Sequence, residues 1–241
     1  MRRVFLAIPT LSGKCLPGTD QAVGFFELEA ESMGWGFTQL RWSQDSLIVH
    51  ARNVCVAKFM ESDATDMLFL DSDVACGPGV FTRLMTHTAE LVAGVYRVKN
   101  DNERYPVIPI DGGAKQDGET GLLEVKDIPF GLVRIRRSVI EKMIAADPDN
   151  WFYANNAERT KCHMLFNTEV RDREFHGEDY YFCRKWREIG GKVYIDPEFR
   201  LAHVNSDGKS FAGSFADFLR RHGSISARPA ADVVTLAAEA A

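Results

Sequence analysis

The sequence lacks long apolar runs and an excess of positive charge. No segment approaches the roughly 18 apolar residues that a membrane-spanning helix needs. The apolar stretch that follows Arg2 and Arg3 ends at Pro9, which is too short for a signal peptide. The 29 basic residues are outnumbered by 34 acidic ones, for a formal net charge of -5. Generic binding to nucleic acid or to an anionic membrane is therefore not favoured, and we expect a cytoplasmic protein without a transmembrane segment.

Paired cysteines are also missing. The five cysteines are odd in number, lie far apart and form no CxxC pair, so neither a disulfide framework nor a zinc ribbon is indicated. A zinc site built from Cys162, His163, His176 and Cys183 would match no common ligand spacing. We therefore expect reduced thiols.

The composition is that of a globular enzyme. The chain has 241 residues, of which 45% are hydrophobic and 11% aromatic. This is enough for one sizeable core but little for two full domains. Residues from about 224 to 241 are Ala-rich with few large apolar side chains. We expect one domain over residues 1–223, followed by a flexible tail over 224–241.

Strand-like and helix-like segments alternate along the first hundred residues. This alternation predicts an α/β fold, with a mostly parallel, Rossmann-like sheet and flanking helices. The expected strands are 4–8, 36–41, 66–70, 90–95, 122–125, 131–135, 193–195 and 199–203, and the expected helices are 21–32, 50–62, 79–86, 138–146 and 178–189. The second half is less regular: residues 111–120 are typical of a hairpin or mobile loop, and residues 147–168 have no clear pattern.

One basic cluster stands out, formed by Arg134, Arg136 and Arg137. It lies at an expected strand-to-helix junction. Short basic runs are usually solvated, so we expect an exposed edge.

Asp71 and Asp73 directly follow the apolar segment from Met67 to Leu70. Ligands of open α/β sheets bind outside the carboxyl ends of strands, and carboxylates are preferred ligands of magnesium and manganese. An ion held there could neutralise charge on a diphosphate leaving group. Asp is also common in turns, so the pattern alone leaves a structural role open.

Two other positions are candidates for chemistry. Glu178 and Asp179 follow a glycine and open an amphipathic helix. The helix dipole accounts for one acidic residue there, at roughly 0.3–1 kcal/mol, and the other could act as a general base toward a hydroxyl. His203 ends a short strand that could direct its imidazole toward Asp73, although a lone histidine is more often structural.

The joint order of several short motifs resembles the GT-A nucleotide-sugar glycosyltransferases, including small bacterial and phage members similar to family 2. The matching segments are Ala7-Ile8-Pro9-Thr10, Ala51-Arg52-Asn53, Leu70-Asp71-Ser72-Asp73, Gly94-Val95-Tyr96, Gly131-Leu132-Val133-Arg134-Ile135 with Arg137, and Gly177-Glu178-Asp179-Tyr180-Tyr181-Phe182-Cys183 with Gly190, Asp196-Pro197 and His203. They span about residues 4 to 205. The chain departs from the family pattern at Asn205, where a glycine is commoner.

The resemblance implies a GT-A fold with a nucleotide-binding half (1–100) and an acceptor-side half (101–223). It implies metal-dependent transfer of a sugar from a nucleoside-diphosphate sugar, with UDP-sugar favoured, to an acceptor hydroxyl. Inversion at the anomeric carbon is favoured, and retention stays open because the GT-A frame serves both outcomes.

The resemblance also implies residue roles. Asp73 and His203 would bind manganese or magnesium, and Asp71 would contact the ribose or the metal. Asp179 would be the acceptor-activating base, with Glu178 contacting the sugar or acceptor.

The remaining implied roles concern the donor nucleotide. Pro9 and Thr10 would border the base and ribose, Arg52 would approach the phosphates, and Ser72 lies in the same donor loop. Gly131 would allow close approach of the backbone to the sugar or acceptor.

Two other functions fit the same residues. An apolar strand followed by Asp-x-Asp-x-[Thr/Val] is also the nucleophile signature of haloacid dehalogenase-like phosphohydrolases, which the segment Leu68-Phe69-Leu70-Asp71-Ser72-Asp73-Val74 resembles. In such an enzyme Asp71 would attack phosphorus and Asp73 would act as acid/base. That signature normally lies near the chain start, whereas two βα units precede it here. The other alternative is a non-catalytic sugar-nucleotide-binding module.

The acceptor and the oligomeric state are not determined by the sequence. A glycan, a protein, a metabolite and a modified nucleic acid all remain open as acceptors. The aromatic run Trp151, Phe152 and Tyr153 is the candidate acceptor platform.

Overall fold

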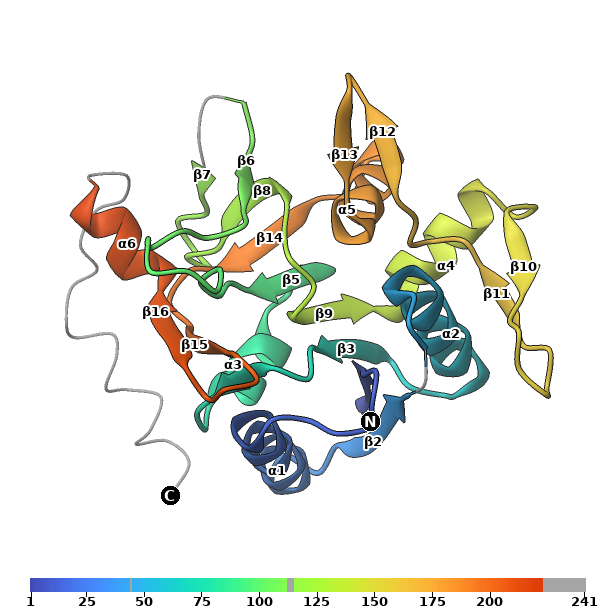
Figure 1. The fold of residues 1–241 in the computed structure, drawn as a ribbon, viewed down its shortest axis with the longest axis horizontal. Coiled ribbons are helices and arrows are strands. Elements are labelled where there is room, and N and C mark those ends of the chain that lie inside the picture. Colours follow the sequence, from blue (N-terminus) through green and yellow to red (C-terminus); the bar gives the residue numbers. More distant parts are fainter. Residues whose placement is uncertain (44, 112–114, 223–241) are drawn as a thin grey trace.

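A central β-sheet covered by helices on both faces organises the chain (Figure 1). The computed structural model describes residues 1–43, 45–111 and 115–222. The strands of the central sheet are β1 (Arg3–Pro9), β2 (Gly36–Trp42), β3 (Asp66–Leu70), β5 (Leu91–Gly94), β6 (Ile108–Pro109), β7 (Lys115–Gln116), β8 (Leu123–Asp127), β9 (Leu132–Arg136) and β14 (Val193–Asp196). Their order is β2-β1-β3-β9-β5-β14-β8-β6, and β7 also pairs with β8.

Most strands of this sheet run in the same direction. β1 is parallel to β2 and β3, and β5 is parallel to β14. Within the described part of the chain the reversed strands are β9, which is antiparallel to β3 and β5, and β8, which is antiparallel to β14, β6 and β7. The predicted α/β class with a mostly parallel sheet and flanking helices is confirmed.

Alternate side chains of the sheet are buried against different helices. The helices are α1 (Pro17–Ser32), α2 (Ile48–Glu61), α3 (Val80–Thr86), α4 (Arg137–Ala146), α5 (Glu178–Glu188) and α6 (Phe215–Arg221). Val4, Leu6 and Ile8 of β1 share a buried cluster with α1 and α3. Phe5 and Ala7 share the other cluster with α2, α4 and α5. This division follows from the two-residue period of a strand.

Local sequence explains where the longer helices begin and end. Proline at the first position of α1 already has a helical φ angle. Gly34 and Gly190, at φ angles of 64° and 88°, follow α1 and α5 in the left-handed region that glycine favours. Helix α5 also carries acidic residues in its first turn and basic residues in its last, which suits the helix dipole.

A second, three-stranded sheet lies beside the central one. It has the order β16-β15-β4 and consists of β4 (Val74–Cys76), β15 (Arg200–Val204) and β16 (Ser210–Ser214). In the antiparallel pairing of β15 with β4, His203 lies opposite Val74. Val74, which follows Asp73, is thereby paired with His203, the predicted metal ligand from the second half of the chain.

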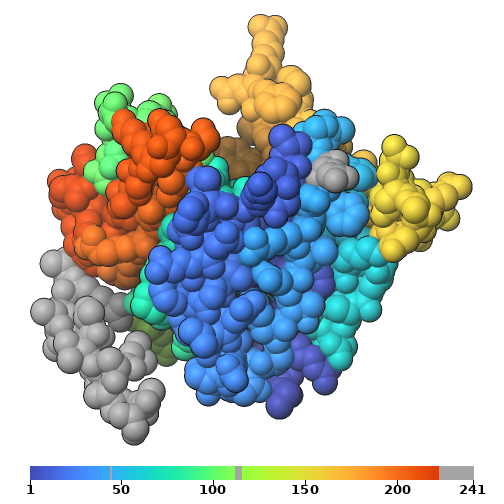
Figure 2. All heavy atoms as spheres, turned by 60° about the horizontal axis from the view of Figure 1, so that its bottom comes forward, coloured from blue at the N-terminus to red at the C-terminus, as the bar shows by residue number. Residues whose placement is uncertain are grey.

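Two hairpins project from the body of the protein (Figures 1 and 2). The first pairs β10 (Trp151–Tyr153) with β11 (Lys161–His163), and the second pairs β12 (Glu169–Arg171) with β13 (Glu174–His176). The first hairpin lies in the segment to which the sequence assigns no structure. Phe152 packs toward α2, while Trp151 and Tyr153 are partly exposed on the other side of β10.

The basic cluster is not the exposed edge that the sequence predicts. Arg134 is fully buried, with Nη1 3.5 Å from Asp66 Oδ1 and Nη2 donating to the carbonyls of His87 and Ala89. Arg137 donates to several carbonyl oxygens at the end of α2 and beyond it. That prediction is wrong because β9 lies inside the sheet, between β3 and β5, and is buried on both faces. The guanidinium of Arg134 finds hydrogen-bond acceptors there.

Other predictions lie partly or wholly outside the described residues. The segment 111–120 is described only in part, and the expected tail 224–241 is not described. Among the described residues, no helix is long and apolar enough to cross a membrane.

Candidate active site

Several hydrogen bonds to its backbone hold the turn Asp71-Ser72-Asp73 in place. Val74 N donates to Asp71 O at 3.1 Å and closes the turn. Asp71 N donates to Gly131 O, at the start of β9, at 3.0 Å. Further donors to the turn are Leu16 N and Thr19 Oγ1 on Ser72 O and Val204 N on Asp73 O. The two carboxylates therefore leave the sheet from a fixed backbone.

Arg52 joins this turn to the start of α5. Its side chain is almost completely buried, and its Nη2 donates to Asp71 Oδ1 at 3.0 Å while its Nε donates to Glu178 Oε1 at 3.1 Å. Burial alone would lower the pKa of Arg52, but the negative charges of Asp71 and Glu178 outweigh it and raise the pKa further. The guanidinium is permanently charged and contacts Glu178, which lies 126 positions later in the chain than Arg52.

One nitrogen of this guanidinium is left over. Arg52 Nη1 is buried and has no hydrogen-bond partner among the described residues. A buried donor without a partner costs about 1–3 kcal/mol. Since Arg52 lines the cleft described next, a ligand oxygen there could accept this bond.

An open cleft of about 310 Å³ lies over the Asp71 turn. It is lined by Pro9, Ile48, Arg52, Asp71, Ser72, Asp73, Tyr96, Phe130, Glu178 and Asp179. The lining comes from the ends of β1 and β3 and the starts of α2 and α5. This is the edge of the sheet where ligands of α/β proteins bind.

Asp179 has the properties of a general base. Burial, followed by the nearby charge of Glu178, raises the pKa of Asp179 to about 6. Its Oδ1 accepts a hydrogen bond from Tyr180 N at 2.8 Å, which fixes the carboxylate at the first turn of α5. A base with a pKa just below neutral is mostly ionised at pH 7 and still accepts a proton readily.

Asp73 lies between two basic side chains. Its Oδ2 is 3.4 Å from His203 Nε2 and is also bound by the Nζ of Lys99, in the segment between β5 and β6. Burial would raise the pKa of Asp73, but the contacts with His203 and Lys99 outweigh burial and lower it. The other ring nitrogen, His203 Nδ1, lies 3.1 Å from the carbonyl oxygen of Arg97. If that nitrogen carries the proton, the lone pair of Nε2 faces Asp73.

Of the three predicted metal ligands, two fit a divalent cation. Asp73 offers an oxygen and His203 an oriented imidazole nitrogen, a donor pair found in metal sites. Asp71 is turned toward Arg52 instead. In the described ranges no group of three or more His, Cys, Asp or Glu side chains could hold an ion, so the remaining ligands would have to come from substrate or water.

Tyr96 lines the cleft and packs against His203 and Gly131. Its ring is 4.8 Å from the ring of His203, in an edge-to-face arrangement. A Cβ atom at Gly131 would lie 2.4 Å from Tyr96 Cε1. The missing side chain of Gly131 thus makes room for Tyr96, and the predicted approach of a sugar at Gly131 stays a prediction.

The other predicted donor residues differ in their access to the cleft. Pro9 and Ser72 line it. Thr10 is buried, its Oγ1 donates to Lys14 O at 3.0 Å and its N donates to Trp42 O at 2.8 Å. The hydroxyl of Thr10 is therefore engaged within its own loop.

Four lining or adjoining residues were not assigned roles from the sequence: Ile48, Tyr96, Lys99 and Phe130. Tyr96 lies within a matching motif, which is a usable signal. Lys99 sits in a polar loop where no pattern marks it.

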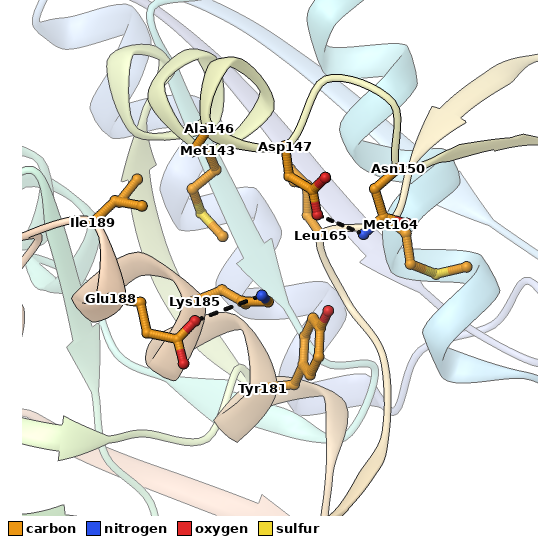
Figure 3. A pocket seen from close by; sticks show the side chains of 10 residues that line it. All are labelled: Met143, Ala146, Asp147, Asn150, Met164, Leu165, Tyr181, Lys185, Glu188 and Ile189. Carbon is orange, nitrogen blue, oxygen red and sulfur yellow. Dashed lines mark hydrogen bonds and ion pairs between the residues drawn. The ribbon is translucent and has the colours of Figure 1, made fainter.

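A separate groove of about 150 Å³ lies between α4 and α5, remote from these carboxylates (Figure 3). Apolar side chains such as Met143 and Leu165 line it. Lys185 and Glu188 pair 3.5 Å apart at its edge. It shares no lining residue with the cleft over the Asp71 turn.

The chain resembles solved structures in its fold. A197 from STIV matches with a TM-score of 0.53 and 21% identity, over 89% of this chain and 95% of that one. GalNAc-T7, solved with UDP, GalNAc and Mn²⁺, matches with a TM-score of 0.47 and 14% identity, over 84% of this chain and 43% of that one. A Drosophila β1,4-galactosyltransferase 7 mutant, solved with manganese, UDP-Gal and xylobiose, has a TM-score of 0.44 and 12% identity, over 98% and 80% of the two chains.

The likeness to A197 shows a shared fold but assigns no activity, and the two weaker matches support no conclusion about this chain. No protein-family model matches the sequence, and no curated protein matches it. The activity of the site therefore has to be inferred from its own residues.

Proposed function

We propose that this protein transfers a glycosyl group from a nucleoside-diphosphate sugar to an acceptor hydroxyl. One observation carries the proposal: a carboxyl group with a pKa near 6, Asp179, shares a cleft with the Asp71-Ser72-Asp73 turn at the end of β3. A base and a turn whose carboxylate can hold a cation against a diphosphate, in one cleft, meet the two requirements of this reaction. The motif order that resembles GT-A glycosyltransferases supports the same reaction.

Asp179 is the proposed base. As the acceptor oxygen forms its bond to the anomeric carbon, the bond from that carbon to the diphosphate oxygen breaks and the acceptor proton passes to Asp179. This direct displacement inverts the configuration. Glu178 is already bound to Arg52, so it is better suited to orient the sugar or acceptor than to take the proton.

The donor diphosphate is proposed to lie between Arg52 and Asp73. Arg52 Nη1 is a buried donor that lacks a partner among the described residues, and a phosphate oxygen would satisfy it. Asp73 and His203 are the proposed holders of manganese or magnesium. The ion would supply charge neutralisation for the leaving nucleoside diphosphate.

The nucleotide base and ribose are proposed to lie toward Pro9 and Ile48, at the other end of the cleft. UDP is the favoured nucleotide, as the family resemblance suggests. The exposed rings of Trp151 and Tyr153, whose centroids are 5.2 Å apart, stay the proposed acceptor platform. Lys161 and Arg159 already lie over these rings, so an acceptor would have to displace them.

Thermal unfolding in the presence of UDP, GDP, CDP and ADP tests the donor site. Each nucleotide is added with manganese, with magnesium or with a chelator. A ligand at a hundred times its dissociation constant stabilises by about 2.7 kcal/mol, which corresponds to a rise of roughly 5–10 °C for a chain of this size. We expect such a rise with one nucleotide, and only with metal.

Turnover is then measured as nucleoside diphosphate released from the matching sugar nucleotides. A nucleotide that stabilises without release from any donor would indicate a binding module. If no nucleotide stabilises the folded protein, the donor site is wrong, and release of phosphate from phosphomonoesters through Asp71 becomes the reaction to test.

A further inference from the structure

The segment between β5 and β6 is tied to β15 and to the turn that follows it. Val98 N donates to Arg104 O at 3.0 Å within this segment. Lys209 Nζ pairs with Asp101 Oδ1 at 2.6 Å, which ties the segment to the β15–β16 turn. The contact of Arg97 O with His203 Nδ1 ties it to β15. Lys99 is therefore delivered to a defined place and is not a freely moving surface lysine.

Lys99 lies against the carboxylate of Asp73, which is a predicted metal ligand. Lys99 Nζ and His203 Nε2 both approach Oδ2 of Asp73. The side chains of Lys99 and Asp73 are only 27% and 32% exposed, so water screens this pair less than it would a surface pair. An ammonium group and a divalent cation cannot both lie against this oxygen without strong repulsion.

Charge balance at the site points the same way. Arg52 is shared by Asp71 and Glu178, and Lys99 is the cation that lies against Asp73. A divalent ion at Asp73 would therefore have to replace Lys99 as the counter-charge of this carboxylate. A donor diphosphate brings new negative charge, which gives the Lys99 ammonium an alternative partner.

We propose that Lys99 is an internal counter-ion of Asp73 that competes with the divalent cation, so that metal binds well only when a diphosphate draws the Lys99 ammonium away. This rests on the proposed function. Metal and nucleotide then strengthen each other's binding by the same factor, as linkage requires. Lys99 thereby binds the donor diphosphate, and it weakens binding of the metal ion when no donor is bound.

The test is Mn²⁺ binding to the purified full chain, followed by the electron paramagnetic resonance signal of free Mn²⁺, with and without UDP. In the wild type we expect weak binding of Mn²⁺ alone and binding at least tenfold tighter with UDP. In Lys99→Met we expect Mn²⁺ alone to bind at least fivefold tighter than in the wild type, and the effect of UDP to shrink by a similar factor. UDP binding in the presence of a chelator, measured by calorimetry, should weaken.

Matched variants separate competition from other effects. Lys99→Arg keeps the positive charge and should keep weak binding of Mn²⁺ alone. Lys192→Met removes one positive charge from a pair with Glu124 that contacts none of these residues, and it should leave Mn²⁺ binding as in the wild type. Lys99→Met with Asp73→Asn should abolish the gain, which would assign it to this carboxylate.

The outcomes distinguish the two proposals. If Lys99→Met binds Mn²⁺ no tighter than the wild type while UDP still strengthens Mn²⁺ binding, the counter-ion role is wrong and the donor site stands. If neither protein binds Mn²⁺ with UDP or with any of the other three nucleotides, the metal-assisted donor site is itself wrong. If Lys192→Met gives the same gain as Lys99→Met, general charge and not the contact with Asp73 is responsible.

Discussion

At the scale of single residues, the fold changes the acid–base chemistry of Asp179 in the cleft. Its ordinary pKa would leave it a weak base, and burial beside Glu178 raises that pKa to about 6. The raised pKa of Asp179 should affect both catalysis and stability, so it can be tested by two independent measurements.

Replacing Asp179 by Asn should abolish turnover and spare donor binding. General bases contribute about 10²–10⁴-fold to rate, so we expect kcat to fall by that factor while the dissociation constant of UDP changes little. Asp127→Asn is the matched control, because burial also raises the pKa of Asp127 but its side chain lies in a different, charged pocket. Full turnover by Asp179→Asn would eliminate this residue as the base.

Asp179→Asn should also make the protein more stable at alkaline pH. The unfolded carboxyl titrates near pH 3.9 and the folded one near 6. A raised pKa contributes stability below the unfolded value, and this contribution is lost as the pH rises through 6. The variant should therefore gain on the order of 2 kcal/mol at pH 8 and little at pH 4.

Urea unfolding of both proteins at the two pH values measures this difference. An equal effect at pH 4 and pH 8 would mean that ionisation of Asp179 is not the cause.

Residue identity was easier to predict from the sequence than residue contacts. Asp71, Asp73, Glu178 and Asp179 could be named as candidates because acidic residues follow a strand end or open a helix. The ion pair of Lys99 with Asp73 could not, because it joins a polar loop to a strand end and no local pattern carries it. Their roles in the reaction stay predictions.

At the scale of secondary structure elements, Arg52 connects α2, the end of β3 and the start of α5. Breaking a buried ion pair leaves its partners as uncompensated charges. Arg52→Met should therefore cost about 3–5 kcal/mol of unfolding free energy, measured by urea unfolding. Lys58→Met is the control on the same helix, since Lys58 pairs with exposed Glu61 and Glu158 and exposed pairs contribute about 0–1 kcal/mol.

A loss below 1 kcal/mol for Arg52→Met would show that the linked carboxylates find other partners. In that case Arg52 would not be the residue that sets the spacing of β3 and α5.

The accuracy of the sequence-based elements depended on their length and periodicity. The predicted strand 66–70 coincides with β3, and the helix predicted at 178–189 is α5 to within a residue. β4 has only three residues, and the β10–β13 hairpins are short and carry many polar residues, so no period could be recognised. The reversed direction of β9 was also beyond prediction, because an apolar run carries no sign of its orientation.

At the scale of the whole molecule, the central sheet is shared by both halves of the chain. β9, from the second half, lies between β3 and β5 of the first. Such interleaving favours one cooperative unit and agrees with the predicted single domain, which still requires a test.

Urea unfolding should therefore show a single transition. Trp35 packs with the α1 and α3 side of the sheet and Trp186 with the α2, α4 and α5 side, so tryptophan fluorescence reports on both faces. We expect its midpoint to coincide with that of far-ultraviolet circular dichroism. Two separate transitions would divide the chain into independently folding parts.

The guanidinium of Arg52 also limits how this protein can be recombined. Its Nη2 donates to Asp71 in residues 1–100, and its Nε donates to Glu178 in residues 101–223. A chimera that takes its second half from another protein would inherit a buried positive charge without its second partner. Exchange of acceptor specificity by swapping halves should therefore succeed only when the incoming half supplies a carboxylate at the position of Glu178.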